Sequence, residues 1–350
     1  MSVTATPAWI LTGQSGTDSL ELAESYELPR LGPDDVLVQI HAASLNYREL
    51  AIAKGTFNLP LTPPVVPGSD GAGTILATGP SVTDFQKGDR VVTHLTVNSP
   101  DNAPPTFAEI NAGLGQKVDG TLRKYGVFHQ TSVVKMPDTL SFNQAATLTC
   151  SGLTAWNALF GLRGRQLGEG DVVLVQGTGG VSIAALQFAL ASGATVIATT
   201  SSDSKGEKLK ALGAQHVINY RTTSNWGEVA KSLTPENRGA DVIVDVGGLS
   251  TVAQSLKAVR TDGVIALAGV LGAGGEENVP SIMDALTYLC TTRGFLLGTR
   301  TQFREMNRFI DEKGIKPVVD ERVFGFGEVR EAYELVGAQQ HFSKVVIEIK

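Results

Sequence analysis

The sequence GTGGVS at residues 177–182 has the residue types and spacing that point most directly to chemistry. It follows the apolar run VVLVQ and precedes IAALQFA, so we expect a strand, a turn and a helix. In such a turn Gly177 permits a tight bend, Gly179 lets backbone approach a phosphate, and the helix N-terminus faces the anion. Ser182 replaces the last glycine of the G-x-G-x-x-G pattern. A turn without a ligand is the alternative to a pyrophosphate site. The predicted contacts are Gly177, Thr178, Gly179, Gly180 and Val181.

The end of the next expected strand indicates which dinucleotide binds. A site for NAD places an acidic residue there, which bonds the ribose 2′-hydroxyl. This chain has Thr200, Ser201 and Ser202 instead, with Lys205 one turn into the following helix. Hydroxyls and a cation suit a 2′-phosphate, so we predict NADP(H). Asp203 could be taken for the missing acid, but we expect it to start the helix.

Alternating strand and helix patterns surround this turn and must position it. The segment 172–202 contains no charged residue, which is also a feature of membrane spans. Four glycines interrupt it, so we interpret it as a strand–helix–strand unit buried in a parallel sheet. The pattern predicts an α/β fold with a doubly wound parallel sheet. Its strands are expected at 172–176, 195–200, 216–219, 241–246, 264–268 and 294–298, and its helices at 181–192, 205–212, 226–233, 249–259 and 280–290.

The remainder of the chain predicts a second, β-rich domain. Apolar runs that are bounded by Pro and Gly turns suggest strands near 36–43, 65–79 and 87–95, before an irregular excursion at 96–120. After residue 299 we expect a helix at 303–312, a further helix, and a strand from Lys344 that returns to the first domain. Residues 1–150 and 299–350 would then form one discontinuous domain, and residues 151–298 the dinucleotide-binding domain.

The composition excludes several classes of function. The net charge of −6 argues against nucleic acid as a partner, so a small-molecule substrate is expected. Two cysteines cannot form a disulfide framework or a four-cysteine zinc site. The opening MSVTATPAWILTGQ lacks a basic region followed by an apolar run, so a cytoplasmic location without a membrane anchor is expected.

Over nearly its whole length the chain resembles the medium-chain dehydrogenase/reductases. The resemblance lies in VLVQIHAASLNYREL, PGSDGAGTI, KGDRVV, CSGLTAW, VLVQGTGGVS, GADVIVDVGG and SKVVIEI. The stretch ASLNYRE makes it most similar to the zinc-independent quinone oxidoreductase branch, which includes the zeta-crystallin-like proteins. The resemblance implies a Rossmann domain, a GroES-like β-rich domain, and a homodimer joined through the last sheet strand.

The zinc ligands of related alcohol dehydrogenases can be compared with this chain position by position. Asn46 stands at the first cysteine position, Ser69 and Asp70 replace His-Glu, and Cys150 is retained. One thiolate cannot hold catalytic zinc, so no metal is expected. The hydroxyl and histidine that relay the alcohol proton are matched by Arg48 and Ala51, so that relay is absent too.

The resemblance also assigns further cofactor contacts. Thr154 matches a hydroxyl beside the nicotinamide, and Tyr220 matches a position near the 2′-phosphate. Lys344 matches a cation that reaches the pyrophosphate, although a solubilising charge at a strand edge is the alternative. The remaining expected contacts are Gly247, Ala268, Gly269, Val270, Phe295, Leu296 and Leu297.

Hydride transfer without a metal requires another way to accept charge on the substrate oxygen. Quinones and α,β-unsaturated carbonyls meet this need through their own conjugation. Asn46, Tyr47 and Arg48 are the expected catalytic residues, because ASLNYRE should pass beneath the nicotinamide. Asn46 is also expected to reach the nicotinamide ribose. Tyr47 is interpreted as a wall of the pocket in preference to a general acid.

Three functions therefore remain open at this point. The first is an NADPH-dependent quinone or enone reductase. The second is a zinc-free alcohol dehydrogenase or carbonyl reductase. The third is an NADPH-binding sensor without catalysis.

Overall fold

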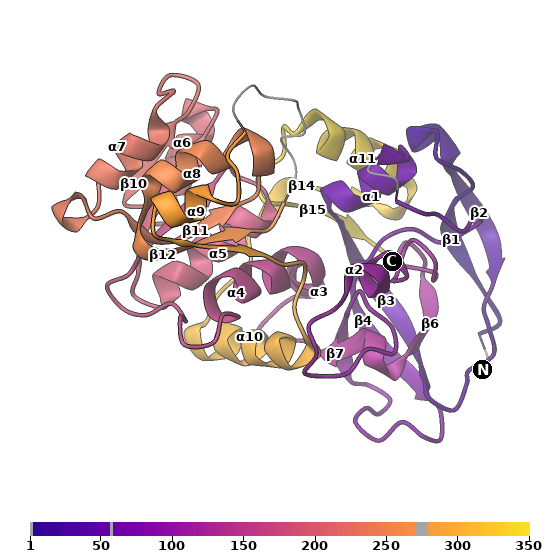
Figure 1. Cartoon of the computed structure of the whole chain (residues 1–350). Coiled ribbons are helices and arrows are strands. Elements are labelled where there is room, and N and C mark those ends of the chain that lie inside the picture. The colour runs from indigo at the N-terminus through magenta and orange to yellow at the C-terminus, as the bar shows by residue number, and fades with distance from the viewer. Residues whose placement is uncertain (1–2, 57–58, 270–278) are drawn as a thin grey trace. The chain divides into compact units, whose positions relative to one another are not determined.

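The computed structural model describes residues 3–56, 59–269 and 279–350 (Figure 1). By its internal contacts the chain divides into two compact units. Unit 1 comprises Met1–Leu153 and Gly298–Lys350, and unit 2 comprises Thr154–Leu297. The expected residue Val270 lies outside the described residues.

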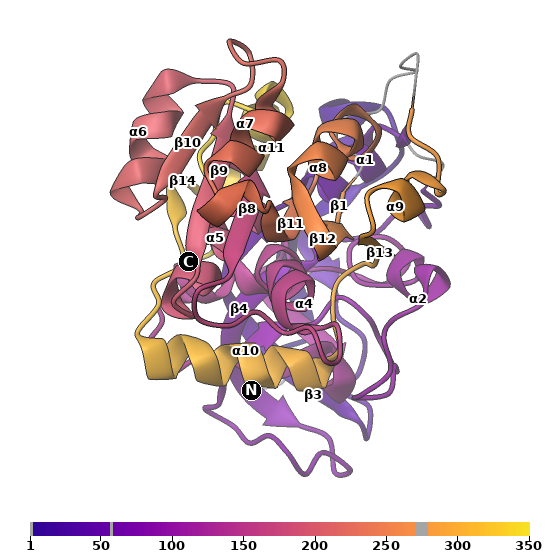
Figure 2. The same cartoon turned by 60° about the vertical axis from the view of Figure 1, so that its left-hand side comes forward.

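Unit 2 is built on a six-stranded sheet in the order β10-β9-β8-β11-β12-β13, with every neighbouring pair parallel. This is the doubly wound arrangement, in which the strand order reverses beside β8. The helices α6, α7 and α8 lie along its strands (Figure 2). The strands are β8 (Val172–Gln176), β9 (Thr195–Thr200), β10 (His216–Asn219), β11 (Ala240–Asp245), β12 (Val259–Leu267) and β13 (Thr291–Gly294). The helices are α4 (Leu153–Phe160), α5 (Gly180–Ala191), α6 (Asp203–Ala211), α7 (Trp226–Ser232), α8 (Val252–Ala258) and α9 (Asp284–Thr287).

The central strands of this sheet are buried on both faces, which explains their apolar sequences. Every residue of β8 and of β11 is buried. Leu174, Ile197, Ile243 and Ile265 meet in one hydrophobic core. The charge-free segment is thus a buried strand–helix–strand unit, as predicted. No helix among the described residues is long and apolar enough to span a membrane.

The last strand and helix of unit 2 differ from the sequence prediction. The strand β13 is the polar run Thr291–Gly294, whereas we expected 294–298. Its pairing with β12 runs from Thr291 to Gly294, and then Leu297 adopts φ 57°, which a continuing strand does not allow. The helix expected at 280–290 is limited to α9, Asp284–Thr287.

Unit 1 has a sheet in the order β14-β15-β3-β4-β5-β7, with β6 also paired to β3, and a separate β1–β2 pair. The closing strand β15 pairs antiparallel with β3, placing Val346 opposite Ser44, so the tail does return to the first sheet. The strands are β1 (Ala5–Leu11), β2 (Leu20–Glu27), β3 (Asp35–Leu45), β4 (Asp70–Thr78), β5 (Arg90–Thr93), β6 (Tyr125–His129), β7 (Val133–Lys135), β14 (Val319–Gly325) and β15 (Lys344–Glu348). The α-helices are α1 (Tyr47–Ala53), α2 (Phe107–Asn111), α3 (Phe142–Ala145), α10 (Arg300–Lys313) and α11 (Val329–Ala338).

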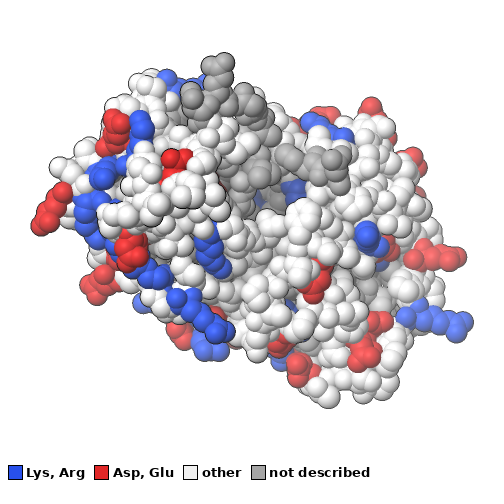
Figure 3. All heavy atoms as spheres, viewed as in Figure 1, with Lys and Arg blue, Asp and Glu red and all other residues white. Residues whose placement is uncertain are grey.

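The predicted fold class is confirmed: a doubly wound parallel sheet together with a separate, discontinuous β-rich unit. A π-helical turn at Leu148–Gly152 ends the first segment of unit 1. Lys and Arg side chains stand among Asp and Glu side chains on the face shown in Figure 3, where they form no large basic patch.

Candidate functional site

The glycine turn joins β8 to α5 in unit 2. Gly177 has φ 74°, a left-handed conformation that favours glycine. A Cβ built at Gly177 or Gly179 meets no described atom within 4 Å, so the turn borders open space. Gly179 is the N-cap of α5 and supplies no side-chain hydrogen bond to the helix. The first N–H groups of a twelve-residue helix are thereby left for an anion.

Ser182 explains why the third glycine can be absent. Its hydroxyl donates a 2.6 Å hydrogen bond to the carbonyl of Gln176, and the side chain is buried. The serine therefore ties the first turn of α5 to the end of β8.

A buried polar network lies at the ends of β8 and β11, and sequence reasoning missed it. Asp245 is fully buried, and its Oδ1 accepts hydrogen bonds from Gly247 N at 3.1 Å and Thr251 Oγ1 at 2.6 Å. Its Oδ2 accepts from Gln176 Nε2 at 3.1 Å and Ser255 Oγ at 2.6 Å. This carboxylate therefore fixes the Gly247 turn beside the glycine turn. The only sequence signal was an Asp at the end of an apolar strand.

The end of β9 presents the predicted hydroxyl groups. Ser202 is the N-cap of α6, and its hydroxyl accepts from Lys205 N at 3.5 Å. Asp203 is the first residue of α6, as predicted, and its carboxylate accepts from Asn219 Nδ2 at 2.7 Å. Tyr220 is 43% exposed and donates its N–H to Thr200 O at 3.0 Å. The structure thus brings Thr200, Ser202, Lys205 and Tyr220 to one edge of the sheet.

The other predicted cofactor contacts of unit 2 lie partly at the same edge. Ala268 and Gly269 follow β12, and Ala268 N donates to Asp245 O at 2.8 Å. Thr154 is buried near the start of α4. Phe295 stacks beneath the Arg293 guanidinium, 4.6 Å from the ring centroid. Of its neighbours, Leu296 is exposed and Leu297 is buried.

In unit 1, polar side chains from four segments meet around the end of β3. We call Asn46, Glu49, Ser69, Asp70, Cys150 and Lys344 the polar cluster. They come from the β3–α1 junction, the β4 start, the π-helical turn and β15. All but Asn46 and Cys150 are buried.

Lys344 is the central cation of the polar cluster. Its ammonium donates to Leu45 O at 2.9 Å, to Asp70 Oδ2 at 3.2 Å and to Asn46 Oδ1. A lysine has three N–H donors, and all three are used within unit 1. Its side chain is 4% exposed, so the alternative of a solubilising edge charge is wrong. The expected pyrophosphate contact would require one of these bonds to break.

Glu49 forms the other half of the polar cluster. Its Oε2 accepts from Asn46 N at 2.8 Å, and its Oε1 accepts from Ser69 Oγ at 2.8 Å. The same hydroxyl lies 2.8 Å from Asp70 Oδ1. Ser69 thus links two buried carboxylates, which are balanced by Lys344 and by Arg48, whose NH1 lies 3.6 Å from Glu49.

The guanidinium of Arg48 has hydrogen-bond partners in another segment of unit 1. Its guanidinium donates to Leu114 O at 3.2 Å, Ile110 O at 3.4 Å and Gln116 Oε1 at 2.8 Å. These partners lie in the 96–120 excursion. Arg48 therefore anchors that segment to α1, and its assignment as a catalytic residue stays a prediction.

The donor set of the polar cluster does not suit a zinc ion. Burial raises the pKa of the Cys150 thiol well above its usual range, and the nearby carboxylates of Asp70 and Glu49 raise it further. Cys150 is the one thiol of the cluster, whereas zinc sites take most of their ligands from cysteine and histidine. Lys344 already supplies a positive charge beside Asp70. In the described part of the chain no group of three or more His, Cys, Asp and Glu side chains could hold a metal ion.

Two histidines of unit 1, His94 and His41, have lowered pKa values. Burial lowers the pKa of His94 to about 4, so this ring is neutral at pH 7. Its Nε2 contacts Gly298 O at 3.2 Å and its Nδ1 contacts Thr96 Oγ1 at 3.1 Å. Burial also lowers the pKa of His41, and the positive charge of Arg90 adds to this effect.

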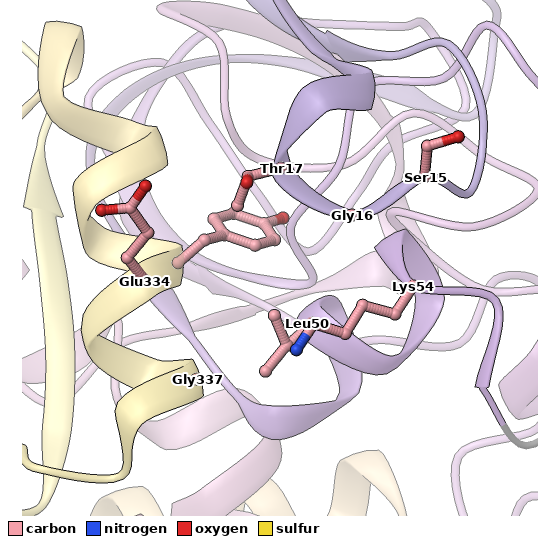
Figure 4. A pocket seen from close by; sticks show the side chains of 8 residues that line it. Ser15, Gly16, Thr17, Leu50, Lys54, Glu334 and Gly337 are labelled. Atoms are coloured by element: carbon pink, nitrogen blue, oxygen red, sulfur yellow. The ribbon is translucent and has the colours of Figure 1, made fainter.

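A separate cavity of about 400 Å³ lies between α1 and α11 in unit 1 (Figure 4). Thr17, Leu50, Lys54 and Glu334 line it. It contains no member of the polar cluster and no predicted site residue, so we do not assign it to the site.

Sequence models of two protein families match the chain. The zinc-binding dehydrogenase model matches residues 180–312, and the alcohol dehydrogenase GroES-like model matches residues 32–138. A zinc-type alcohol dehydrogenase-like protein of Schizosaccharomyces pombe is 46% identical over 96% of each chain. This chain belongs to the medium-chain dehydrogenase/reductase superfamily.

Two further relatives show the range of this superfamily. A crystal structure of a provisionally assigned alcohol dehydrogenase from Sinorhizobium meliloti 1021 superposes with a TM-score of 0.89, at 38% identity and with both chains fully covered. The 2-methylene-furan-3-one reductase of Solanum lycopersicum is 30% identical over 97% of this chain and 78% of its own length. The medium-chain dehydrogenase/reductase described here is thus an oxidoreductase of the alcohol dehydrogenase type with an NAD(P)-binding fold.

Proposed function

We propose that this oxidoreductase reduces a quinone or an α,β-unsaturated carbonyl with NADPH and without zinc. The observation that carries the proposal is the Lys344 ammonium in the polar cluster. It is bonded to Asn46, which stands at the first zinc-binding cysteine position of related alcohol dehydrogenases, and to Asp70, which directly follows Ser69 at the zinc-binding histidine position. An alcohol substrate would lose the metal that stabilises its alkoxide, whereas a conjugated acceptor needs no metal.

We assign a role to each domain on the basis of its local geometry. Residues 151–298 would hold the dinucleotide through the uncapped N-terminus of α5, and residues 1–150 with 299–350 would hold the substrate. The bound nicotinamide supplies a hydride. In the substrate domain Asn46 would donate a hydrogen bond to the substrate oxygen, and Tyr47 would form the pocket wall.

Support for NADPH over NADH comes from the edge formed by β9 and α6. Asp203, the first residue of α6, accepts a hydrogen bond from Asn219 Nδ2, 2.7 Å away. Thr200, Ser202 and Lys205 would contact the 2′-phosphate through hydroxyls and a cation. Tyr220, exposed beside Thr200, would pack against the adenosine.

We also propose a cytoplasmic homodimer. The strand β13 is at one edge of its sheet, and the exposed apolar side chains of Ile282, Met283, Leu286 and Leu289 precede it in the chain. Such an edge would be covered by a second copy. Cys150 and Cys290 are free thiols, as expected for a reducing compartment.

Stopped-flow oxidation of NADPH against matched quinones, enones, aldehydes and ketones tests the function. We expect turnover with the conjugated acceptors, no loss of activity on treatment with a chelator, and no stoichiometric zinc by elemental analysis. Turnover with simple aldehydes and ketones alone would favour a zinc-free carbonyl reductase. Tight NADPH binding without turnover in any class would favour a sensor, and stoichiometric zinc would contradict the proposed chemistry.

A further inference from the structure

The side-chain amide of Asn46 is held on one side only. Its Oδ1 accepts hydrogen bonds from the Lys344 ammonium and from Ser151 Oγ, the latter at 3.2 Å. An ammonium group only donates, so the oxygen of the amide must face Lys344. The NH2 group is consequently on the opposite arm of the amide.

That NH2 group lacks an acceptor. Nδ2 of Asn46 is buried and has no hydrogen-bond partner among the described residues. A buried donor without an acceptor is unfavourable, and native structures seldom retain one without a reason. A ligand oxygen would supply the missing acceptor.

The Lys344 ammonium, which bonds to the Asn46 amide oxygen, is fixed by other hydrogen bonds. Lys344 has a buried ion pair with Asp70, whose Oδ2 also accepts from Cys150 N at 3.3 Å. It also bonds to Leu45 O at the end of β3. A cation that is bonded to the amide oxygen polarises the amide and makes its NH2 group a stronger donor.

We propose that Lys344 is a positioning residue that fixes the Asn46 amide so that its NH2 group donates a hydrogen bond to the substrate carbonyl or quinone oxygen. This inference rests on the proposed function. As hydride adds to the conjugated system, negative charge develops on that oxygen, and a fixed donor stabilises it most at that stage. The ammonium would therefore act through Asn46, without contact with the substrate.

Nuclear magnetic resonance of the full-length protein labelled with ¹⁵N-asparagine tests the orientation without turnover. The Asn46→Asp variant identifies the Asn46 NH2 signal by its loss. We expect the signal to be protected from solvent exchange, and to lose protection in the charge-balanced double variant Asp70→Asn/Lys344→Met. Lys135→Met, which alters an exposed lysine of the same unit, is the control and should leave it unchanged.

The acceptor is tested with 2-cyclohexen-1-one added to the NADP⁺-saturated protein. The Asn46 NH2 signal should shift with this ketone and not with cyclohexene, which lacks the oxygen. A shift caused by NADP⁺ alone, with no further change on adding the ketone, would overturn the proposal and assign the donor to the cofactor. The absence of any shift would also overturn it.

Kinetics separate positioning from a merely structural role. With NADPH and 2-cyclohexen-1-one, Asn46→Ala should lower kcat/KM about 100-fold and the double variant about tenfold, mainly through kcat. A double variant with reduced thermal stability but wild-type kinetics and a protected amide signal would refute the role of Lys344. A failure of the proposed function alone would give a different result. The ketone would still shift the protected Asn46 NH2 signal, but the wild-type protein would reduce no acceptor.

Discussion

The glycine turn of unit 2 and the polar cluster of unit 1 are built in opposite ways. The turn uses backbone groups from one continuous segment and borders open space at Gly177 and Gly179. The polar cluster uses side chains from distant segments, and its charges are buried and paired. A backbone site tolerates changes of side chain at most positions, whereas a charge cluster depends on every partner.

The largest effect is expected when the charge balance of the polar cluster is broken. Asp70→Asn leaves the Lys344 ammonium buried without a carboxylate, which should lower the free energy of unfolding by about 3–5 kcal/mol. Urea unfolding measures this change. The double variant Asp70→Asn/Lys344→Met should recover most of the loss, because it removes both charges.

The exposed pair Lys257–Glu228 provides the matched control for this prediction, with 38% and 59% of the two side chains exposed. Glu228→Gln should lower the free energy of unfolding far less than Asp70→Asn, because water screens this exposed pair. If Asp70→Asn cost no more than this control, the polar cluster would not be the stabilising centre that its burial indicates.

The same contrast explains what could be predicted from the sequence. The glycine turn was predictable because its strand, turn and helix are contiguous, and Asp203 was correctly expected to start a helix. The polar cluster was only partly predictable: the positions of Asn46, Ser69 and Asp70 were evident from the resemblance, but not their pairing with Lys344. That pairing depends on the register of β15 against β3, which no local pattern encodes.

Arg48 and β13 show two other limits of sequence reasoning. The motif that contains Arg48 gives no sign that its guanidinium bonds to the 96–120 segment. The polar strand Thr291–Gly294 lacks the apolar pattern by which strands are recognised, and the apolar run after it turns away at Leu297. In both cases tertiary contacts outweigh the local signal.

A smaller but more specific effect is expected in the glycine turn. Gly179→Val should weaken NADPH binding about 100-fold, because its side chain would occupy the space that a pyrophosphate needs. The free energy of unfolding should change by no more than about 1 kcal/mol. Calorimetric titration with NADPH and urea unfolding measure the two quantities.

Gly327→Val is the matched control, since a Cβ built there also meets no described atom within 4 Å. It should leave NADPH binding unchanged. Equal affinities of the two variants would show that the glycine turn does not hold the cofactor, and would remove the basis of the contrast with the polar cluster.

The smallest effect is expected at Lys205, the charged side chain that we assign to the dinucleotide site. Lys205→Ala should weaken NADPH binding about tenfold and leave NADH binding unchanged, because only NADPH carries the 2′-phosphate. Lys208→Ala, one turn further along α6, controls for the loss of a positive charge from the same helix. Fluorescence titration with both cofactors measures the four affinities. If Lys205→Ala lowered the affinities for NADPH and NADH equally, the contact between Lys205 and the 2′-phosphate would be refuted. If Lys205→Ala and Lys208→Ala lowered the NADPH affinity equally, the effect of Lys205 would be a general attraction by the positive charge of the helix.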